Sequence, residues 1–182
     1  MNDSKKTAQT DYLRACLQDS YFTLLQEKPA EKISVSEIVK LAGISRMSFY
    51  RYCENKDDII RQFLEDSFKK YMAVVDEESV KNSLEAATLF FGYFRSNRVR
   101  MRALIDQGLF HLLFESFPRF LQVSNLSIES TPDIPQQYRE YYYEYASGGL
   151  LNLAKAWVAT GMKDSDREMA QALRKIKKVQ GR

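Results

Sequence analysis

The sequence predicts an all-α protein of about nine helices, and three observations support that fold class. Hydrophobic residues make up 45% of the 182-residue chain, enough for a buried core in one domain or in two small ones. Proline and glycine, which break helices and form turns, occur only 4 and 7 times. Apolar side chains recur every three or four residues, and the sequence contains no convincing strand and no internal repeat.

The first helix is expected over residues 11–26. Its apolar side chains occupy two neighbouring sets of helically spaced positions, so the buried stripe is broad. Pro29 ends this helix, because proline lacks a backbone amide hydrogen and its ring clashes with the turn before it. The stripe consists of Tyr12, Leu13, Ala15, Cys16, Leu17, Tyr21, Phe22, Leu24 and Leu25.

Two short helices, over residues 35–41 and 46–53, are expected next. Ser34 and Glu37 have the spacing of a capping box, which begins a helix by satisfying its first free amides. Gly43 is placed to end that helix, since glycine adopts a positive φ without a Cβ clash. Two short helices joined by so tight a turn are typical of a helix-turn-helix.

Six further helices complete the prediction. The long fourth helix begins near the polar segment 55–58 and extends to about residue 75. A second capping-box pattern, Ser165 and Glu168, precedes the last helix. The segment 123–135 is rich in serine and proline and is the best loop candidate. The remaining helices are expected over residues 80–94, 97–105, 108–121, 138–161 and 165–178.

Composition narrows the possible functions. The single histidine, His111, excludes a three-histidine zinc site, and the two cysteines cannot supply the four ligands of a zinc finger. Neither of the glycine-rich phosphate-binding motifs, GxxxxGK[ST] and GxGxxG, occurs. We therefore expect no metal, no cofactor and no enzymatic activity. A small enzyme using His111 with Cys16 or Cys53 is the alternative, although a histidine among apolar residues is typical of helix packing.

The sequence also predicts a cytoplasmic protein. The first residues contain no apolar segment of the kind found in secretory signals. No uninterrupted apolar run approaches the roughly 18 residues of a membrane span. Two cysteines do not make a disulfide framework, which fits a reducing compartment. The net charge of +3 is too small by itself to indicate nucleic-acid binding.

Residues 41–60, LAGISRMSFYRYCENKDDII, resemble the signature of the TetR family of bacterial transcriptional regulators. That signature combines an A-G-hydrophobic-S turn, a Y-x-[HY]-F segment in the second helix and K-[DE] before the next helix. The chain departs from it at Cys53, where the family usually carries phenylalanine. The matching residues are Ala42, Gly43, Ile44, Ser45, Ser48, Phe49, Tyr50, Tyr52, Lys56, Asp57 and Ile59.

The resemblance implies two domains, a helix-turn-helix DNA-binding domain over residues 1–54 and a helical effector-binding and dimerisation domain over residues 55–182. Residues 145–168 are similar to the last two helices of a TetR branch that includes regulators near dihydroxyacetone-kinase genes. The implied function is a repressor that binds an inverted-repeat, double-stranded DNA operator as a homodimer and is released by a small-molecule effector. A TetR-fold co-activator acting through a protein partner is the alternative.

The residues expected to contact DNA lie in and around the helix-turn-helix. Residues 38–56 carry four basic side chains and one acidic one, although residues 1–60 contain nine of each. Arg46 and Arg51 can each donate two hydrogen bonds to a guanine, and Met47 can contact a thymine methyl group. A solvated helix face is the alternative for the two arginines.

Further DNA contacts involve phosphates. Ser36 and Ser45 stand at helix starts, where free amides and partial positive charge attract phosphate. The TetR resemblance assigns phosphate or groove contacts to Ser48, Tyr50, Tyr52 and Lys56. Lys5 and Lys6 either reach along the DNA or belong to an unstructured tail.

The last two helices are implied by the resemblance to pair with a second copy of the chain as a four-helix bundle. The adjacent glycines at 148 and 149 cost about 1 kcal/mol each in a helix relative to alanine, so a close helix approach is expected there. An intrachain core is the alternative. The predicted interface residues are Ala146, Gly149, Leu150, Leu153, Trp157, Leu173 and Ile176.

An effector pocket is expected among the fourth to eighth helices. Aromatic stripes at helical spacing are more often core than pocket, so ordinary core packing is the alternative. The arginines within 95–102 are either solvated charges or an anionic effector site. The predicted effector-binding residues are Phe90, Phe94, Leu104, Phe110, His111, Phe114 and Tyr142.

Overall fold

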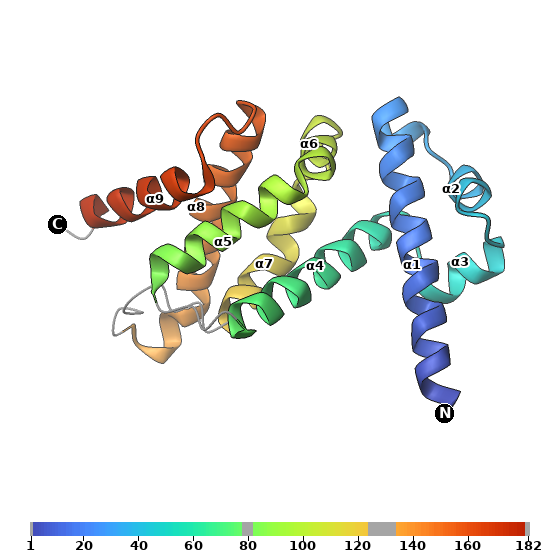
Figure 1. Ribbon diagram of the computed structural model, residues 1–182, viewed down its shortest axis with the longest axis horizontal. Helices are drawn as coiled ribbons and strands as arrows, with labels where there is room; N and C mark the ends of the chain where they lie inside the picture. Colours follow the sequence, from blue (N-terminus) through green and yellow to red (C-terminus); the bar gives the residue numbers. More distant parts are fainter. Residues whose placement is uncertain (1, 78–81, 124–133, 181–182) are drawn as a thin grey trace. The chain divides into compact units, whose positions relative to one another are not determined.

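The computed structural model describes residues 2–77, 82–123 and 134–180 (Figure 1). These ranges contain nine α helices, two short 3-10 helices and no strand, which confirms the predicted all-α fold class. Most of the loop expected over residues 123–135 lies outside the described residues. The elements are α1 (Asn2–Glu27), η1 (Ala30–Lys32), α2 (Val35–Ala42), α3 (Arg46–Tyr52), α4 (Asp57–Glu77), α5 (Ser83–Ser96), α6 (Arg98–Asp106), α7 (His111–Val123), η2 (Gln136–Tyr138), α8 (Arg139–Ala159) and α9 (Asp166–Gln180).

Three helix starts differ from the sequence prediction by three residues or more. α1 begins at Asn2 instead of residue 11. The sequence prediction missed the added segment because that segment is almost entirely polar and shows no apolar periodicity. α5 begins at Ser83 instead of residue 80, because Asn82 caps it. The Asn82 Oδ1 accepts hydrogen bonds from the amides of Leu84 at 3.0 Å and Glu85 at 3.1 Å. α7 begins at His111 instead of residue 108, because Gly108 has φ +70° and belongs to the turn that closes α6.

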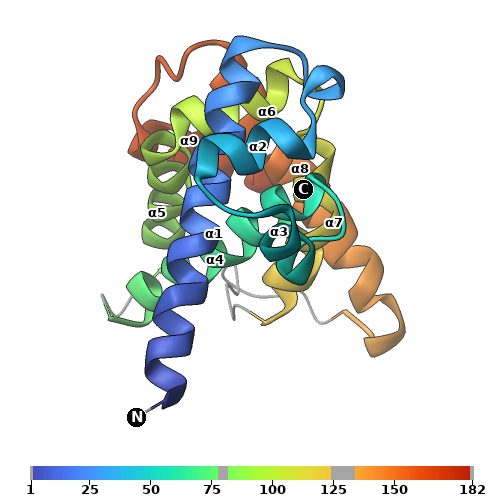
Figure 2. The same ribbon diagram turned by 90° about the vertical axis from the view of Figure 1, so that its right-hand side faces the viewer.

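The chain divides into two compact units, residues 1–66 and 67–182, and α4 contributes residues to both. In the first unit, α2 packs against α1 and α3, and Figure 2 shows α2 and α3 in front of α1. Burying a large apolar side chain stabilises the fold by about 1.5–3 kcal/mol. The largest fully buried side chains of this unit are Leu17, Tyr21, Leu25, Ile38, Phe49, Ile59, Ile60 and Leu64.

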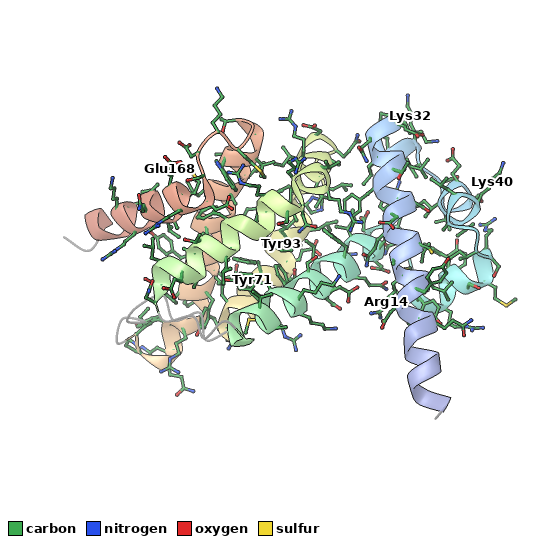
Figure 3. All side chains as sticks on the ribbon, viewed as in Figure 1. Arg14, Lys32, Lys40, Tyr71, Tyr93 and Glu168 are labelled. Atoms are coloured by element: carbon green, nitrogen blue, oxygen red, sulfur yellow. The ribbon has the colours of Figure 1, made fainter. Side chains whose placement is uncertain are left out.

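The second unit is built around an aromatic cluster. In it α7 packs on α8, and α9 packs on α5. Phe68 of α4 stacks on Phe120 of α7 with ring centroids 4.4 Å apart, and Tyr71 meets Phe120 edge-on at 5.8 Å. The Tyr71 hydroxyl, labelled in Figure 3, donates to the Ala86 carbonyl at 2.9 Å. Such ring pairs add about 0.5–1.5 kcal/mol each beyond their buried area, so this cluster ties α4 to α7.

The loop between α8 and α9 is held by Arg95 of α5. Its Nε donates to Asp166 Oδ1 at 2.6 Å, and its two Nη atoms donate to the carbonyls of Asp164 at 2.6 Å and Met162 at 3.2 Å. The guanidinium also lies 4.8 Å from the centre of the Trp157 ring, whose indole N–H donates to the Asp164 carbonyl at 3.1 Å. One side chain thus fixes the end of α8, the loop and the start of α9.

Two of the arginines within residues 95–102 are therefore already engaged inside the chain. Arg95 is paired with Asp166, and Arg102 pairs with Asp106, one turn further along α6, with Nε 2.8 Å from the carboxylate. Two of the four arginines in this segment already have carboxylate partners within the chain. The structure gives the anionic effector site no support from these two residues.

Replacing Arg95 by methionine, Arg95→Met, is expected to lower the free energy of unfolding by about 1–3 kcal/mol, because the carbonyls of Met162 and Asp164 and the Asp166 carboxylate lose charged hydrogen bonds. Hydrogen exchange should accelerate in α9 before it does in α7. Arg102→Met is the matched control, since its ion pair is about half exposed and should cost less. Equal losses in the two variants, measured by urea unfolding, would contradict the role given to Arg95.

Candidate nucleic-acid interface

The predicted capping box at the start of α2 is confirmed. The Glu37 amide donates to Ser34 Oγ at 3.3 Å, and the Ser34 amide donates to Glu37 Oε2 at 2.9 Å. Each side chain satisfies an amide that has no partner inside the helix. The carboxylate also accepts a hydrogen bond from Lys28, so α2 is joined to the segment that follows α1.

The turn between α2 and α3 depends on Gly43. It has φ +68° and closes α2 with its amide 3.3 Å from the Lys40 carbonyl, and the Ile44 amide bonds the Val39 carbonyl at 3.0 Å. A side chain at this φ costs roughly 1–2 kcal/mol in L-residues. The predicted C-cap is thus confirmed, and the sharp turn brings the start of α3 beside the end of α2.

α3 is capped by Ser45, whose Oγ accepts the Ser48 amide at 3.0 Å. Phe49 is fully buried and its ring meets the ring of Tyr50 edge-on at 5.1 Å. With Phe49 turned into the core, the rotation of this short helix about its axis is fixed. Its other side chains therefore project in directions that the helical repeat determines.

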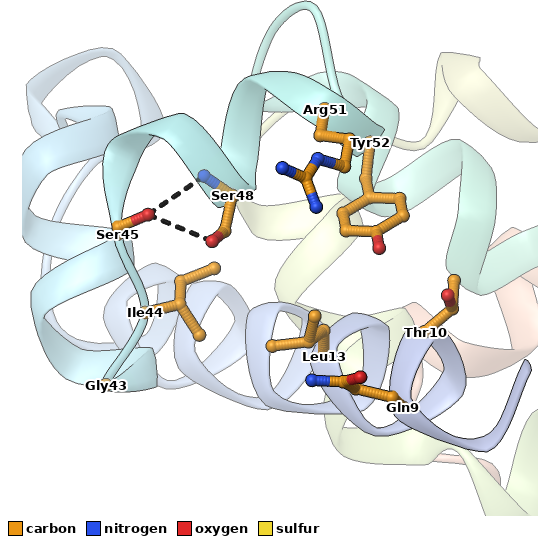
Figure 4. A pocket seen from close by; sticks show the side chains of 9 residues that line it. All are labelled: Gln9, Thr10, Leu13, Gly43, Ile44, Ser45, Ser48, Arg51 and Tyr52. Carbon is orange, nitrogen blue, oxygen red and sulfur yellow. Dashed lines mark hydrogen bonds between the residues drawn. The ribbon is translucent and has the colours of Figure 1, made fainter. Parts of the chain in front are cut away.

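Two other faces of α3 result. An outward face carries Arg46, Met47 and Tyr50, all exposed, with 77% of Met47 and 54% of Tyr50 accessible. A side face carries Ser48 and Arg51 together with Tyr52, and it borders a cavity of about 410 Å³ whose opposite wall is α1 (Figure 4). The sequence assigned both arginines to base reading, but the structure places them on different faces.

Lys56 has a structural role that the sequence did not indicate. Its Nζ donates to the Ile33 carbonyl at 3.1 Å and also to the Ala30 carbonyl. These bonds connect the start of α4 to η1 and the segment before α2. Because two of the three ammonium hydrogens are used in this way, a phosphate contact by Lys56 stays a prediction with at most one hydrogen to offer.

Cys53 stands where the family usually carries phenylalanine, and it is buried all the same. Gln62 fills part of the space, with Nε2 3.6 Å from the Cys53 Sγ and 2.6 Å from the Tyr52 carbonyl. Burial raises the pKa of the Cys53 thiol to about 11. The thiol is therefore protonated near neutral pH and is a poor nucleophile, which argues against an enzyme built on Cys53.

Comparison with known families assigns both halves of the chain. The model of the bacterial regulatory proteins of the tetR family matches residues 22–63, and that of a transcriptional regulator C-terminal region matches residues 81–178. The second match spans more than half of the chain. This chain belongs to the TetR family.

Solved structures of TetR regulators share its fold. A putative TetR-family transcriptional regulator from Syntrophomonas wolfei is 18% identical, over 93% of this chain and 94% of that one, with a TM-score of 0.65. A TetR transcriptional regulator from Streptococcus agalactiae is 18% identical, over 93% and 96%, with 0.63. The dihydroxyacetone kinase operon activator DhaS is 17% identical, over 92% and 95%, with 0.60. No curated protein sequence matches significantly.

Neither a metal-binding cluster nor a membrane-spanning helix is found among the described residues of this TetR-family protein. Among the residues that the structure describes, no group of three or more histidine, cysteine, aspartate or glutamate side chains is arranged to hold a metal ion. No helix in those ranges is long and apolar enough to cross a membrane. What remains as the candidate site is the exposed surface of α3 and its surroundings.

The predicted effector-binding residues differ in burial. Four of them are buried, and Phe90 and Phe94 pack with ring centroids 4.9 Å apart. Phe110 and Phe114 form a second pair at 6.1 Å. His111 lies on the surface, with Nδ1 3.0 Å from the Gly108 carbonyl oxygen, and so is not in the buried clusters.

The predicted dimer residues also differ in burial. Trp157 is only 3% exposed and packs inside its own chain, with its ring 5.4 Å from that of Phe91. Gly149 and Ile176 are exposed, and the other four are half-buried. A Cβ built on Gly149 meets no atom within 4 Å, so this glycine makes no close approach within the chain. The exposed positions are the ones left for a partner.

Several residues that shape the site carry no local sequence signal. Lys28 and Lys56 act on elements distant in sequence, and Gln9 and Thr10 lie in the polar part of α1 that periodicity does not reveal. In the second unit, the Ser116 hydroxyl is buried with no hydrogen-bond partner among the described residues. Such residues can be identified only from the three-dimensional structure, which shows which distant segments of the chain lie in contact.

The capping box makes the stability of the DNA-binding unit depend on pH. The bond from Lys28, with those from the Ser34 amide and hydroxyl, lowers the pKa of Glu37 to about 2. Its contribution is complete above the ordinary value near 4.5 and is lost as pH falls from there towards 2. Glu37→Gln should therefore show a weaker loss of stability than wild type between pH 5 and pH 2.5, measured by urea unfolding. Parallel pH curves would contradict the pairing.

Proposed function

We propose that this TetR-family protein is a repressor that binds an inverted-repeat operator as a homodimer and releases it when a small molecule binds. The observation that carries this proposal is the outward face of α3. Large apolar side chains are normally buried, yet Met47 and Tyr50 are prominently exposed beside Arg46 on a helix that is anchored from behind. An exposed face of this composition suits the edges of bases.

The chemistry of this face fits the major groove. Arg46 can donate two hydrogen bonds to guanine O6 and N7, Met47 can contact a thymine methyl group, and Tyr50 offers both a ring and a hydroxyl. Seven residues span about 10 Å along the helix axis. One copy of α3 therefore reaches only a few base pairs, and a specific operator requires a second copy.

The surface of α8 supports pairing of two copies. Its core face is filled by Leu151, Ala154 and Val158, while the opposite face exposes Tyr141 at 73% and Tyr145 at 66%. On that same open side lies Gly149, with free space in front of it. An exposed apolar strip that includes a glycine allows a second helix to approach closely. We place the dimer contact on this strip and on Ile176 of α9.

A two-fold dimer presents its recognition helices as a symmetric pair. The half-sites then repeat about 34–36 Å apart, one turn of the double helix, or a multiple of it. A ligand that binds more tightly to a form with another spacing shifts the population away from the DNA-bound form. The buried Ser116 hydroxyl, which has no hydrogen-bond partner among the described residues, is a polar group that such a ligand would satisfy.

Activation is the second candidate function. One structural relative is an activator by name, and activators and repressors can share this fold. A co-activator acting through a protein partner would use an exposed surface such as the Tyr141 and Tyr145 strip. Deleting the gene decides the sign, because transcription from the operator rises for a repressor and falls for an activator.

Selection from a random DNA pool, followed by footprinting, tests DNA binding directly. The bound sequence should be an imperfect inverted repeat. Arg46→Ala should weaken operator binding by about 1–3 kcal/mol and relax the preference at one position in each half-site. Lys69→Ala, an exposed basic residue of the second unit, is the control and should have little effect. A direct repeat, or selection of no sequence, would contradict the proposal.

The dimer is tested by Gly149→Gln. The side chain has room in the single chain and removes a helix-disfavouring glycine worth about 1 kcal/mol, so the fold should be retained. In a dimer, the same side chain enters the contact between helices and should dissociate it. Light scattering at micromolar concentration should show dimers for wild type and for the control Glu144→Gln, roughly 140° around α8. A monomeric wild type, or a dimeric Gly149→Gln, would refute the interface.

A further inference from the structure

A cavity of about 410 Å³ lies in the first unit between the N-terminal part of α1 and the side face of α3 (Figure 4). α1 provides Gln9, Thr10 and Leu13, and α3 provides Arg51 and other side chains opposite them. The two helices leave the space open because the residues that face each other there are mostly polar. The family resemblance assigns phosphate or groove contacts to Ser48 and Tyr52 of this lining, but it assigns no role to the α1 residues or to the cavity as a whole. Its full lining is Gln9, Thr10, Leu13, Gly43, Ile44, Ser45, Ser48, Arg51 and Tyr52.

The lining of this cavity is suited to an anion. It contains one guanidinium, the Gln9 amide and hydroxyl groups from both helices, and it contains no acidic side chain. Arg51 is exposed, and the described residues provide no ion pair for it. A planar guanidinium offers hydrogen bonds in the geometry that phosphate oxygens accept. The cavity therefore favours a phosphate group over a neutral or cationic ligand.

Three of the backbone amides that border the cavity are already bonded. The amides of Gly43 and Ile44 bond carbonyls of α2, and the Ser48 amide bonds Ser45 Oγ, while the two serine hydroxyls bond each other at 2.9 Å. Recognition in this cavity therefore relies mainly on side chains, with Arg51 supplying the charge.

The position of the cavity on α3 indicates where the phosphate comes from. An α helix with its side chains is about 10–12 Å wide and the major groove is about 12 Å wide, so a helix in the groove has a DNA backbone along each flank. When Met47 and Tyr50 face the base edges, the adjacent side face with Ser48 and Arg51 turns towards one of these backbones. α1 forms the far wall of the cavity on that same side.

We propose that this cavity receives a backbone phosphate of the operator, held by Arg51 of α3 and by Gln9 and Thr10 of α1. The inference rests on the proposed DNA binding by α3 and extends it. It makes α1 part of the DNA interface and assigns Arg51 to the backbone instead of to bases. The two faces of this short helix then have different functions. The outward face selects the sequence, and the side face supplies affinity for any sequence.

The test compares full-length variants on operator DNA and on a scrambled duplex over a range of salt concentrations. Arg51→Met should weaken both duplexes by the same factor and reduce the salt dependence by about one counterion. Thr10→Val and Gln9→Ala should each weaken both duplexes about 2- to 10-fold, the effect of one lost hydrogen bond. Thr23→Val is the matched control, because Thr23 is an exposed threonine of the same helix outside the cavity.

Met47→Ala separates this inference from the function on which it rests. If Met47→Ala loses operator preference while the three cavity variants bind like Thr23→Val, DNA reading by α3 stands and the phosphate site is overturned. If wild type binds neither duplex, the proposed function itself fails. A loss by Arg51→Met on the operator alone would return Arg51 to base reading and also overturn the site.

A methylphosphonate scan identifies the phosphate and its source. Neutralising the one phosphate that occupies the cavity should weaken wild type by the same factor as Arg51→Met, and should weaken Arg51→Met no further. Independent losses at every position would refute the contact. Calorimetry with inorganic phosphate alone tests the alternative that the cavity binds a free phosphorylated compound. Submillimolar binding that Arg51→Met abolishes, together with unchanged DNA affinity in that variant, would assign the cavity to a free phosphorylated compound and overturn the backbone contact.

Discussion

The burial of Phe49 is the constraint on which the proposed DNA-reading surface depends. α3 is a single short helix, and one ring in the core fixes its rotation. The helical repeat then leaves no freedom in the directions of the remaining side chains, so Met47 faces outward and Arg51 faces sideways. A rotation by one residue, about 100°, would turn a different set of side chains outward. The identity of the residues that we propose to face the groove is thus decided by a residue that lies in the core.

In the second unit, the corresponding constraint is a set of polar contacts made by one arginine instead of a buried ring. Arg95 donates hydrogen bonds to two carbonyls and a carboxylate of the α8–α9 segment, and its guanidinium lies over the Trp157 ring. This contact helps to hold Trp157 in the core of its own chain. With Trp157 engaged, the surface left for a partner is the side of α8 that exposes Tyr141 and Gly149. Intrachain packing and the proposed dimer contact therefore occupy separate faces of one helix.

Local signals in the sequence were sufficient for the fold and for the frame of the candidate site. The caps at Ser34 and Ser45 and the turn at Gly43 act within three or four residues, and all three are found in the structure. What sequence reasoning missed acts over longer separations. Lys56 bonds a carbonyl 23 residues away, and Arg95 bonds an aspartate 71 residues away. The polar first turns of α1 gave no periodic signal, so the cavity they line was also missed.

The shortness of α3 makes its function separable from its stability. Isolated helices below about 12–15 residues are marginal in water, so α3 persists because Phe49 is packed, Ser45 caps its start and Gly43 sets its entry. The exposed side chains contribute little to that balance, and changes at such surface positions usually alter stability by no more than about 0.5 kcal/mol. Natural variation at Arg46, Met47 and Tyr50 can therefore change the operator that is recognised while leaving the fold intact. The same freedom does not extend to Phe49, Ser45 and Gly43, because substitutions at these positions alter the structure of α3 itself.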